Sequence, residues 1–79
     1  MKVQVIVRLK HGVLDPQGKA VEKSAKKMGF NEFSNFRIGK IIEFETQLPE
    51  KDAIEKAKKL ANKLLANTVI ESFEVKIKE

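Results

Sequence analysis

Hydrophobic and polar residues alternate along the first ten positions of the chain. Valine or leucine occupies positions 3, 5, 7 and 9, and most positions between them carry lysine, glutamine or arginine. Successive side chains of a strand point to opposite faces of a sheet, so this alternation predicts a half-buried strand over residues 2–10. The same alternation over residues 73–78 predicts another strand.

Two segments carry apolar residues at helical spacing instead. Asp15 and Pro16 suit the start of the first helix, because aspartate caps free backbone N–H groups and proline at the first helical position loses no hydrogen bond. Gly29 is suited to end it. Its inward stripe is made of small residues, which predicts close packing: Gln17, Ala20, Val21, Ser24, Ala25 and Met28. Pro49 starts the second helix, and Asn67 closes it.

The segment between the helices predicts one long strand over residues 33–45. Thirteen residues would extend about 40 Å, whereas strands usually have about 5 or 6 residues. Phe36 and Phe44 share one face of this strand with Lys40, and Gly39, a poor strand residue, stands at its centre. A ferredoxin-like unit has the order β-α-β-β-α-β, with a hairpin at its centre. This chain has a long strand there and no turn residue except Gly39.

We therefore predict an α+β fold with the order β-α-β-α-β, in a single domain of residues 1–79. If the long strand bends at Gly39, its two halves can belong to different sheets. Each chain would then complete a ferredoxin-like unit of a second copy by segment exchange, giving a homodimer. A chain this short buries a modest core, and oligomerisation is a usual source of additional stability.

Composition narrows the function classes. The net charge is +5, and there is no cysteine, which excludes disulfides and thiolate chemistry. Nucleic-acid binding would be better supported by arginine clusters and stacking aromatics, but the aromatic residues are five phenylalanines. No apolar run reaches the ~18 residues of a membrane span, and the alternating first ten residues lack the pattern of a signal peptide. We expect a cytoplasmic protein.

A search for catalytic, metal or cofactor sites gives none. The single histidine, His11, follows a strand into a turn, and no cluster has the spacing of a metal site or a phosphate-binding loop. Gly18 lies inside a helix, where alanine would be more stable by about 0.5–1 kcal/mol. It indicates the close approach of another backbone or a ligand, or it is a harmless first-turn residue. Arg37 and Lys40 point apart in a regular strand, and Lys40 could simply extend to solvent.

Three segments resemble the PurS family, the small subunit of phosphoribosylformylglycinamidine synthase. They are GVLDPQGKAVEKSAKKMGF, FRIGKIIEFE and LLANTVIESFEVKI, in this order and spacing. The resemblance covers residues 3–78. Its most specific parts are the tetrapeptides Asp15–Gly18, Arg37–Lys40 and Leu64–Asn67.

The resemblance implies a non-catalytic subunit of an enzyme of de novo purine biosynthesis. In this family the small subunit is thought to bridge a glutaminase subunit (PurQ) and an ATP-dependent synthetase subunit (PurL), supporting ammonia transfer between them. ATP, with its nucleotide-binding site and magnesium, would belong to the synthetase, and this chain would bind no cofactor. Family members form homodimers or dimers of dimers built from ferredoxin-like units.

The family's recurrent polar and glycine positions imply subunit contacts at six residues of this chain: Asp15, Gln17, Gly18, Arg37, Gly39 and Lys40. Arg37 is the best candidate for a cross-subunit carboxylate pair, because its planar guanidinium binds bidentately. The alternative is a free-standing ferredoxin-like module that binds a ligand or RNA. Exposed stacking aromatics on the sheet would favour that alternative.

Overall fold

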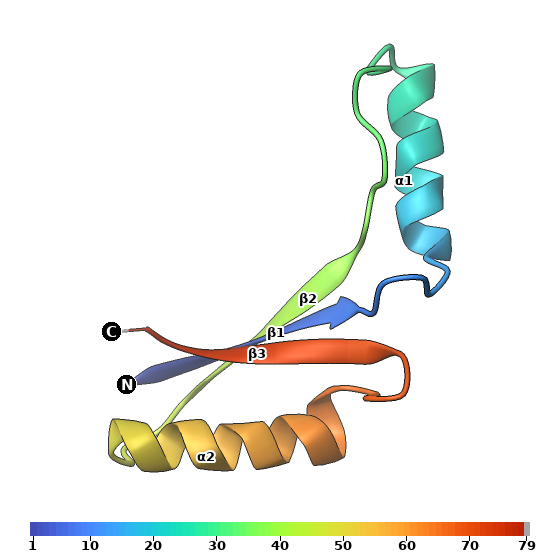
Figure 1. Ribbon diagram of the computed structural model, residues 1–79. Coiled ribbons are helices and arrows are strands. Elements are labelled where there is room, and N and C mark those ends of the chain that lie inside the picture. The colour runs from blue at the N-terminus through green and yellow to red at the C-terminus, as the bar shows by residue number, and fades with distance from the viewer. Residues whose placement is uncertain (79) are drawn as a thin grey trace.

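A three-stranded antiparallel sheet forms the centre of the computed structural model, which describes residues 1–78 (Figure 1). The strand β1 (Lys2–Leu9) lies between β2 (Gly39–Glu45) and β3 (Glu71–Lys78). The order of elements is therefore β-α-β-α-β, as the sequence predicts. The first and last strands lie where the alternation places them.

One face of the sheet carries the core. Val3, Val5 and Val7 of β1 are fully buried there, as the alternation predicts. The helix α2 (Glu50–Leu60) lies along this face and continues into a π-helical turn, η1 (Ala61–Leu65). Its buried residues are alanines, at positions 53, 57 and 61, so the helix backbone can lie close to the sheet.

The register places Lys40 on this core face. Lys40 pairs with Val7, as Ile42 pairs with Val5 and Phe44 with Val3. Paired residues share a face of the sheet, so the predicted position of Lys40 on the apolar side of its strand is confirmed.

The predicted strand over residues 33–45 is wrong in its first half. Only Gly39–Glu45 form a strand, and residues 33–38 run outside the sheet. Gly39 thus begins the strand and does not stand at its centre. The alternation of apolar residues describes which side chains can share a face, but a strand also needs a neighbour for its backbone hydrogen bonds. Within residues 1–78, no strand is paired with residues 33–38.

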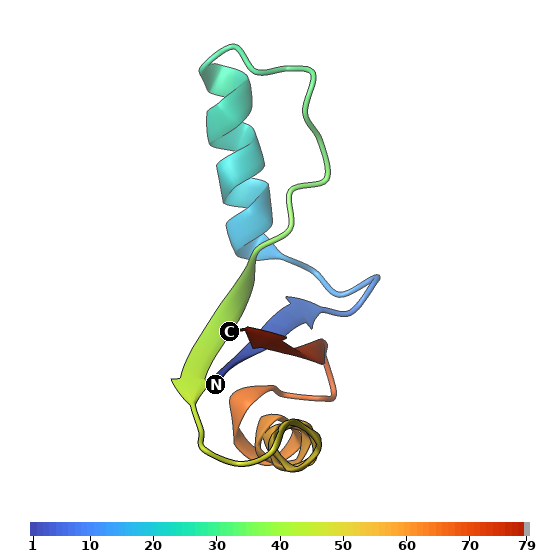
Figure 2. The ribbon, with the colours of Figure 1, turned by 90° about the vertical axis from the view of Figure 1, so that its left-hand side faces the viewer.

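The helix α1 (Pro16–Lys27) stands away from the sheet. We call α1 and the segment that returns to β2, residues 16–38, the arm, and the sheet with α2 and η1 the body. Figure 2 shows the arm rising beyond one end of the sheet, on the side away from α2. The predicted apolar stripe of α1 is consequently exposed: Val21 is 44% and Met28 is 74% accessible. Two phenylalanines of the arm, Phe30 and Phe33, are also exposed and stack with ring centroids 6.3 Å apart.

The helix ends follow the sequence closely. α1 begins at Pro16 after the cap Asp15, and Gly29, with φ of +97°, follows its last turn. α2 begins directly after Pro49, and Asn67 organises the turn that leads to β3 through its side chain and backbone. The π-helical turn was not predicted. Across the described residues 1–78, no helix is long and apolar enough to cross a bilayer.

Candidate functional site

The six predicted contact residues meet where the arm joins the body. They come from the two segments 15–18 and 37–40, which are far apart in the sequence and adjacent in the structure. The connection is the carboxylate of Asp15, which is 4% accessible. It accepts the backbone N–H of Gly18 at 2.7 Å, which caps α1, and the backbone N–H of Ile38 at 2.7 Å, where the arm returns to β2. One side chain therefore ties both ends of the arm together.

Gly18 lies against the returning segment of the arm. A Cβ atom at this position would lie 2.2 Å from the carbonyl oxygen of Phe36 and 2.9 Å from the Asp15 carboxyl group. The prediction that another backbone approaches Gly18 is therefore confirmed, and the approaching backbone belongs to the same chain. Any side chain here would push the two halves of the arm apart.

Two further side chains fasten the arm. The guanidinium of Arg37 donates to the carbonyl oxygens of Val13 at 2.9 Å and Lys10 at 3.3 Å, both in the loop between β1 and α1. Glu22 of α1 accepts the backbone N–H of Phe36 at 3.2 Å and is paired with Lys26. Glu22 could not be singled out from the sequence, because a glutamate on the outer face of a helix has no distinguishing pattern.

Gly39 marks the point where the arm becomes β2. A Cβ atom on Gly39 would lie 2.8 Å from the carbonyl oxygen of Val7 in the neighbouring strand. The glycine thus lets β2 start close beside β1. Lys40 follows at once with an exposed side chain.

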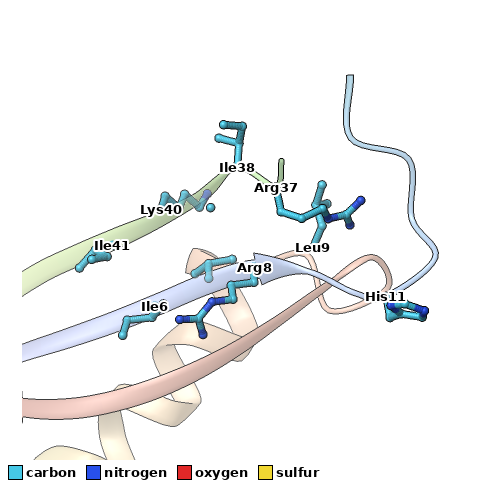
Figure 3. Close-up of a pocket in the computed structure, with 10 residues that line it drawn as sticks. Ile6, Arg8, Leu9, His11, Arg37, Ile38, Lys40 and Ile41 are labelled. Atoms are coloured by element: carbon cyan, nitrogen blue, oxygen red, sulfur yellow. The ribbon is translucent and has the colours of Figure 1, made fainter. Parts of the chain in front are cut away.

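Cavities open on both sides of this junction. A small one of about 280 Å³ is lined by four of the predicted residues, Asp15, Gln17, Gly39 and Lys40, together with Val7, Leu9, Ile38 and Glu71. A larger open groove of about 730 Å³ is shown in Figure 3. Its ionisable lining residues are all basic or histidine: Arg8, His11, Arg37 and Lys40. Arg37 and Lys40 thus border one groove, although they do not form one binding group, because the Arg37 guanidinium is held by the loop carbonyls.

The surroundings of the two carboxylates, Asp15 and Glu22, also lower their pKa values. Hydrogen bonds from the Ile38 and Gly18 amides, with a smaller contribution from the Arg37 charge, hold the pKa of Asp15 below its usual value of 3.8 against the opposing effect of desolvation. The Phe36 amide and Lys26 likewise lower the pKa of Glu22. Both carboxylates are therefore charged acceptors at neutral pH, which makes their hydrogen bonds to the arm backbone stronger than neutral ones.

The side chains of the junction hold backbone atoms of the arm and of the loop before it. Among residues 1–78, no group of three or more potential ligands could hold a metal ion. His11 borders the groove without a carboxylate among the lining residues to orient it. The polar groups of the junction are instead directed at backbone atoms of the arm.

Comparison with known proteins agrees with this arrangement. The family model for PurS, described as phosphoribosylformylglycinamidine (FGAM) synthase, matches residues 2–79. The PurS subunit of phosphoribosylformylglycinamidine synthase from Bacillus subtilis is 44% identical over 78 residues, which cover 99% of this chain and 93% of the relative.

Solved structures agree in fold. PurS from Methanocaldococcus jannaschii superposes with a TM-score of 0.89 at 33% identity, covering 99% of this chain and 95% of that one. A chain in the structure of PurLQS from Thermotoga maritima gives a TM-score of 0.78 at 27% identity, covering 95% of this chain and 93% of that one. The predicted resemblance and the ferredoxin-like fold class are confirmed, and the chain belongs to the PurS family of phosphoribosylformylglycinamidine synthase subunits.

Proposed function

We propose that this chain is the non-catalytic subunit that bridges the glutaminase and the ATP-dependent synthetase of phosphoribosylformylglycinamidine synthase. The observation that carries the proposal is the arm, which is joined to the body by the hydrogen bonds of Asp15 and Arg37 while its apolar side chains are left uncovered. The complex from Thermotoga maritima, described as PurLQS, contains a relative with this fold. The relative from Methanocaldococcus jannaschii is described as one of the subunits of formylglycinamide ribonucleotide amidotransferase.

The first step of assembly is a homodimer made by exchange of arms. Residues 33–38 lie outside the sheet, with Asn35 in a left-handed conformation (φ of +57°), and no strand of residues 1–78 pairs with them, while β2 is an edge strand. Unpaired edges readily accept another strand. The arm of a second copy supplies both this strand and a helix for the core face of the sheet, and it covers the stripe that contains Val21 and Met28.

Labels at the arm test the exchange directly. The chain has no cysteine, so Lys27→Cys introduces a single site for a spin label. A dimer gives a defined inter-label distance in pulsed electron paramagnetic resonance, and Val21→Asp removes it by placing a charge in the apolar contact. Lys23→Asp, on the outer face of the same helix, is the matched control and leaves it. A monomer by sedimentation equilibrium at micromolar concentration contradicts the exchange.

The bridging role has its own test. The chain is expected to co-purify with the glutaminase and synthetase subunits when glutamine and Mg-ATP are present. Its omission should abolish glutamine-dependent turnover while turnover with added ammonia persists, because the synthetase, and not this chain, activates the substrate. Equal loss of both activities would contradict a role in ammonia transfer.

The alternative of an RNA-binding module receives little support. Single-stranded RNA is read by aromatic side chains that stack bases on an exposed sheet. Phe44 and Phe73 lie on the core face of the sheet, packed against its buried residues. The exposed phenylalanines, Phe30 and Phe33, lie in the arm. Salt-sensitive RNA binding, combined with failure to co-purify with the two partners, would favour the module.

A further inference from the structure

The strand β3 forms the edge of the sheet opposite to β2, and within residues 1–78 it has a neighbouring strand on one side only (Figure 2). It pairs with β1 over its whole length, from Glu71 to Lys78, in one continuous register. The strand contains no proline. Unpaired edge strands accept a further strand unless proline, a bulge or charge prevents it. Exchange of arms would use the edge of β2, so it would leave this second edge open.

Hydrogen bonds at the two ends of β1 show which backbone groups of β3 are free. The Lys10 amide donates to the carbonyl oxygen of Ile70 at 2.8 Å, and on the side of β2 the Thr46 amide donates to Met1 at 3.1 Å. Bonded and non-bonded pairs alternate along an antiparallel ladder. Even-numbered residues of β1 are therefore bonded to β3, and odd-numbered ones to β2. The backbone N–H and C=O groups of three residues of β3 consequently point away from the sheet: Phe73, Val75 and Ile77.

Two lysines beside this edge have no acidic residue opposite them. Lys76 and Lys78 lie on the sheet face turned away from α2, and their partners on β1 are Gln4 and Lys2. Like charges directly opposite each other in a ladder are destabilising. The acidic partner of Lys2 is Glu45, which lies on the far side, in β2. The outer strand therefore presents two positive charges at alternate positions, both on the same face.

Other charges of this face have partners within the chain. Glu74 precedes the two lysines on the same face of β3, and its carboxylate is paired with the guanidinium of Arg8 at 3.1 Å. Glu43 of β2 accepts a hydrogen bond from Gln4. Among the described residues, the charge that this face leaves for another molecule is thus the positive charge at the end of β3.

We propose that the edge of β3 binds an extended, acidic segment of a catalytic subunit of the synthase as an additional strand. The inference rests on the proposed bridging function. The incoming backbone pairs with the free groups of β3, and Asp or Glu at two alternate positions faces Lys76 and Lys78. In this mode of recognition backbone pairing gives affinity and side chains give selectivity. A second copy is a poorer occupant, because the glutamate that its own β3 carries on this face is held by Arg8.

Hydrogen exchange at single amides tests the added strand. In the free chain the amides of Val75 and Ile77 should exchange quickly, while those of Glu74 and Lys76, which are bonded to β1, should be protected. On addition of the synthetase or the glutaminase, the Val75 and Ile77 amides should exchange about tenfold more slowly or less. Glu74 and Lys76 are the internal references. Adding the two subunits separately shows which of them carries the segment.

Reversal of charge tests the chemistry of the segment. A variant with Lys76→Glu and Lys78→Glu should bind that subunit about tenfold more weakly, since two favourable cross-strand pairs become repulsive. The matched control is Lys59→Glu, an exposed charge reversal on α2 that should leave binding unchanged. Circular dichroism verifies the fold of each variant. Sedimentation equilibrium verifies that the homodimer is kept, because exchange of arms does not use β3.

Three results would overturn the inference, and they differ in what they mean for the bridging function. If a subunit binds while the Val75 and Ile77 amides stay fast, or binds the reversed variant as well as the wild type, bridging stands and this edge is not an acid-selective contact. If neither subunit binds, the bridging function fails together with the inference. If the two amides slow in the chain alone as its concentration rises, the occupant of the edge is a second copy.

Discussion

The carboxylate of Asp15 accepts the backbone N–H of Ile38 at 2.7 Å, across 23 positions of sequence, while also capping α1 through Gly18. One side chain thus caps the helix and also makes a tertiary contact. The consequence is that the orientation of the arm depends on a residue that sequence patterns explain as a cap alone. In the exchanged dimer proposed above, the orientation of the arm would also set the geometry of the assembly.

Asp15→Asn should therefore loosen the joint while leaving the body intact. An amide offers one acceptor oxygen where the carboxylate offers two, and its NH₂ group would face one of the two backbone donors. We expect hydrogen exchange at the Ile38 amide to become several-fold faster, with the amides of β1 unchanged. Lys19→Ala on the same helix is the matched control. Unaltered exchange at Ile38 would show that the carboxylate does not hold the arm.

Stability should depend on pH through the same group. The pKa of Asp15 is lower in the folded chain than its usual value of 3.8, so the folded state binds fewer protons there than the unfolded state. This contribution to stability is therefore fully present above the usual pKa and is lost as pH falls through the lower, folded pKa. Thermal unfolding followed between pH 6 and pH 3 should show a decline toward acid that is shallower in Asp15→Asn. Equal slopes would contradict the assignment, and Glu22→Gln provides the comparison for the second lowered carboxylate.

Gly18→Ala should destabilise the chain although alanine is the better helix former. Helix propensity favours alanine by about 1 kcal/mol. The added Cβ would lie 2.2 Å from a backbone oxygen, however, and a backbone cannot move aside as cheaply as a flexible side chain. Overpacking of this kind usually costs about 1–3 kcal/mol. The difference of these two effects is a net loss of up to about 2 kcal/mol in urea unfolding, whereas Lys23→Ala on the exposed face should be neutral or slightly stabilising.

Local rules predict most of this molecule. Alternation places β1 and β3, and capping residues place both helices, because these features depend on neighbours a few positions away. At Gly18 the sequence left two alternatives open, a close contact or a harmless first-turn residue, and the structure shows the close contact with the carbonyl oxygen of Phe36. What fails is the strand over residues 33–38, because alternation alone predicted it and no strand within residues 1–78 pairs with this segment. The role of Glu22 and the π-helical turn could not be predicted either, because each depends on contacts with distant parts of the chain and not on a local pattern.

Variants of Arg37 can separate two functions of this residue, which are to hold the loop before α1 and to contact another subunit. Its guanidinium holds the carbonyls of Val13 and Lys10, so the side chain fixes the loop that leads into α1. Arg37→Ala should therefore increase hydrogen exchange in the loop and, by misplacing the arm, weaken binding of the other subunits and lower glutamine-dependent turnover. Arg37→Lys keeps the charge but loses the planar pair of donors, which the two loop carbonyls and a bidentate carboxylate pair both need. If Arg37→Lys restores subunit binding while the loop stays mobile, the contact across the interface needs only a positive charge, and the bidentate carboxylate pair is contradicted. If neither variant changes assembly or turnover, Arg37 is not a contact residue.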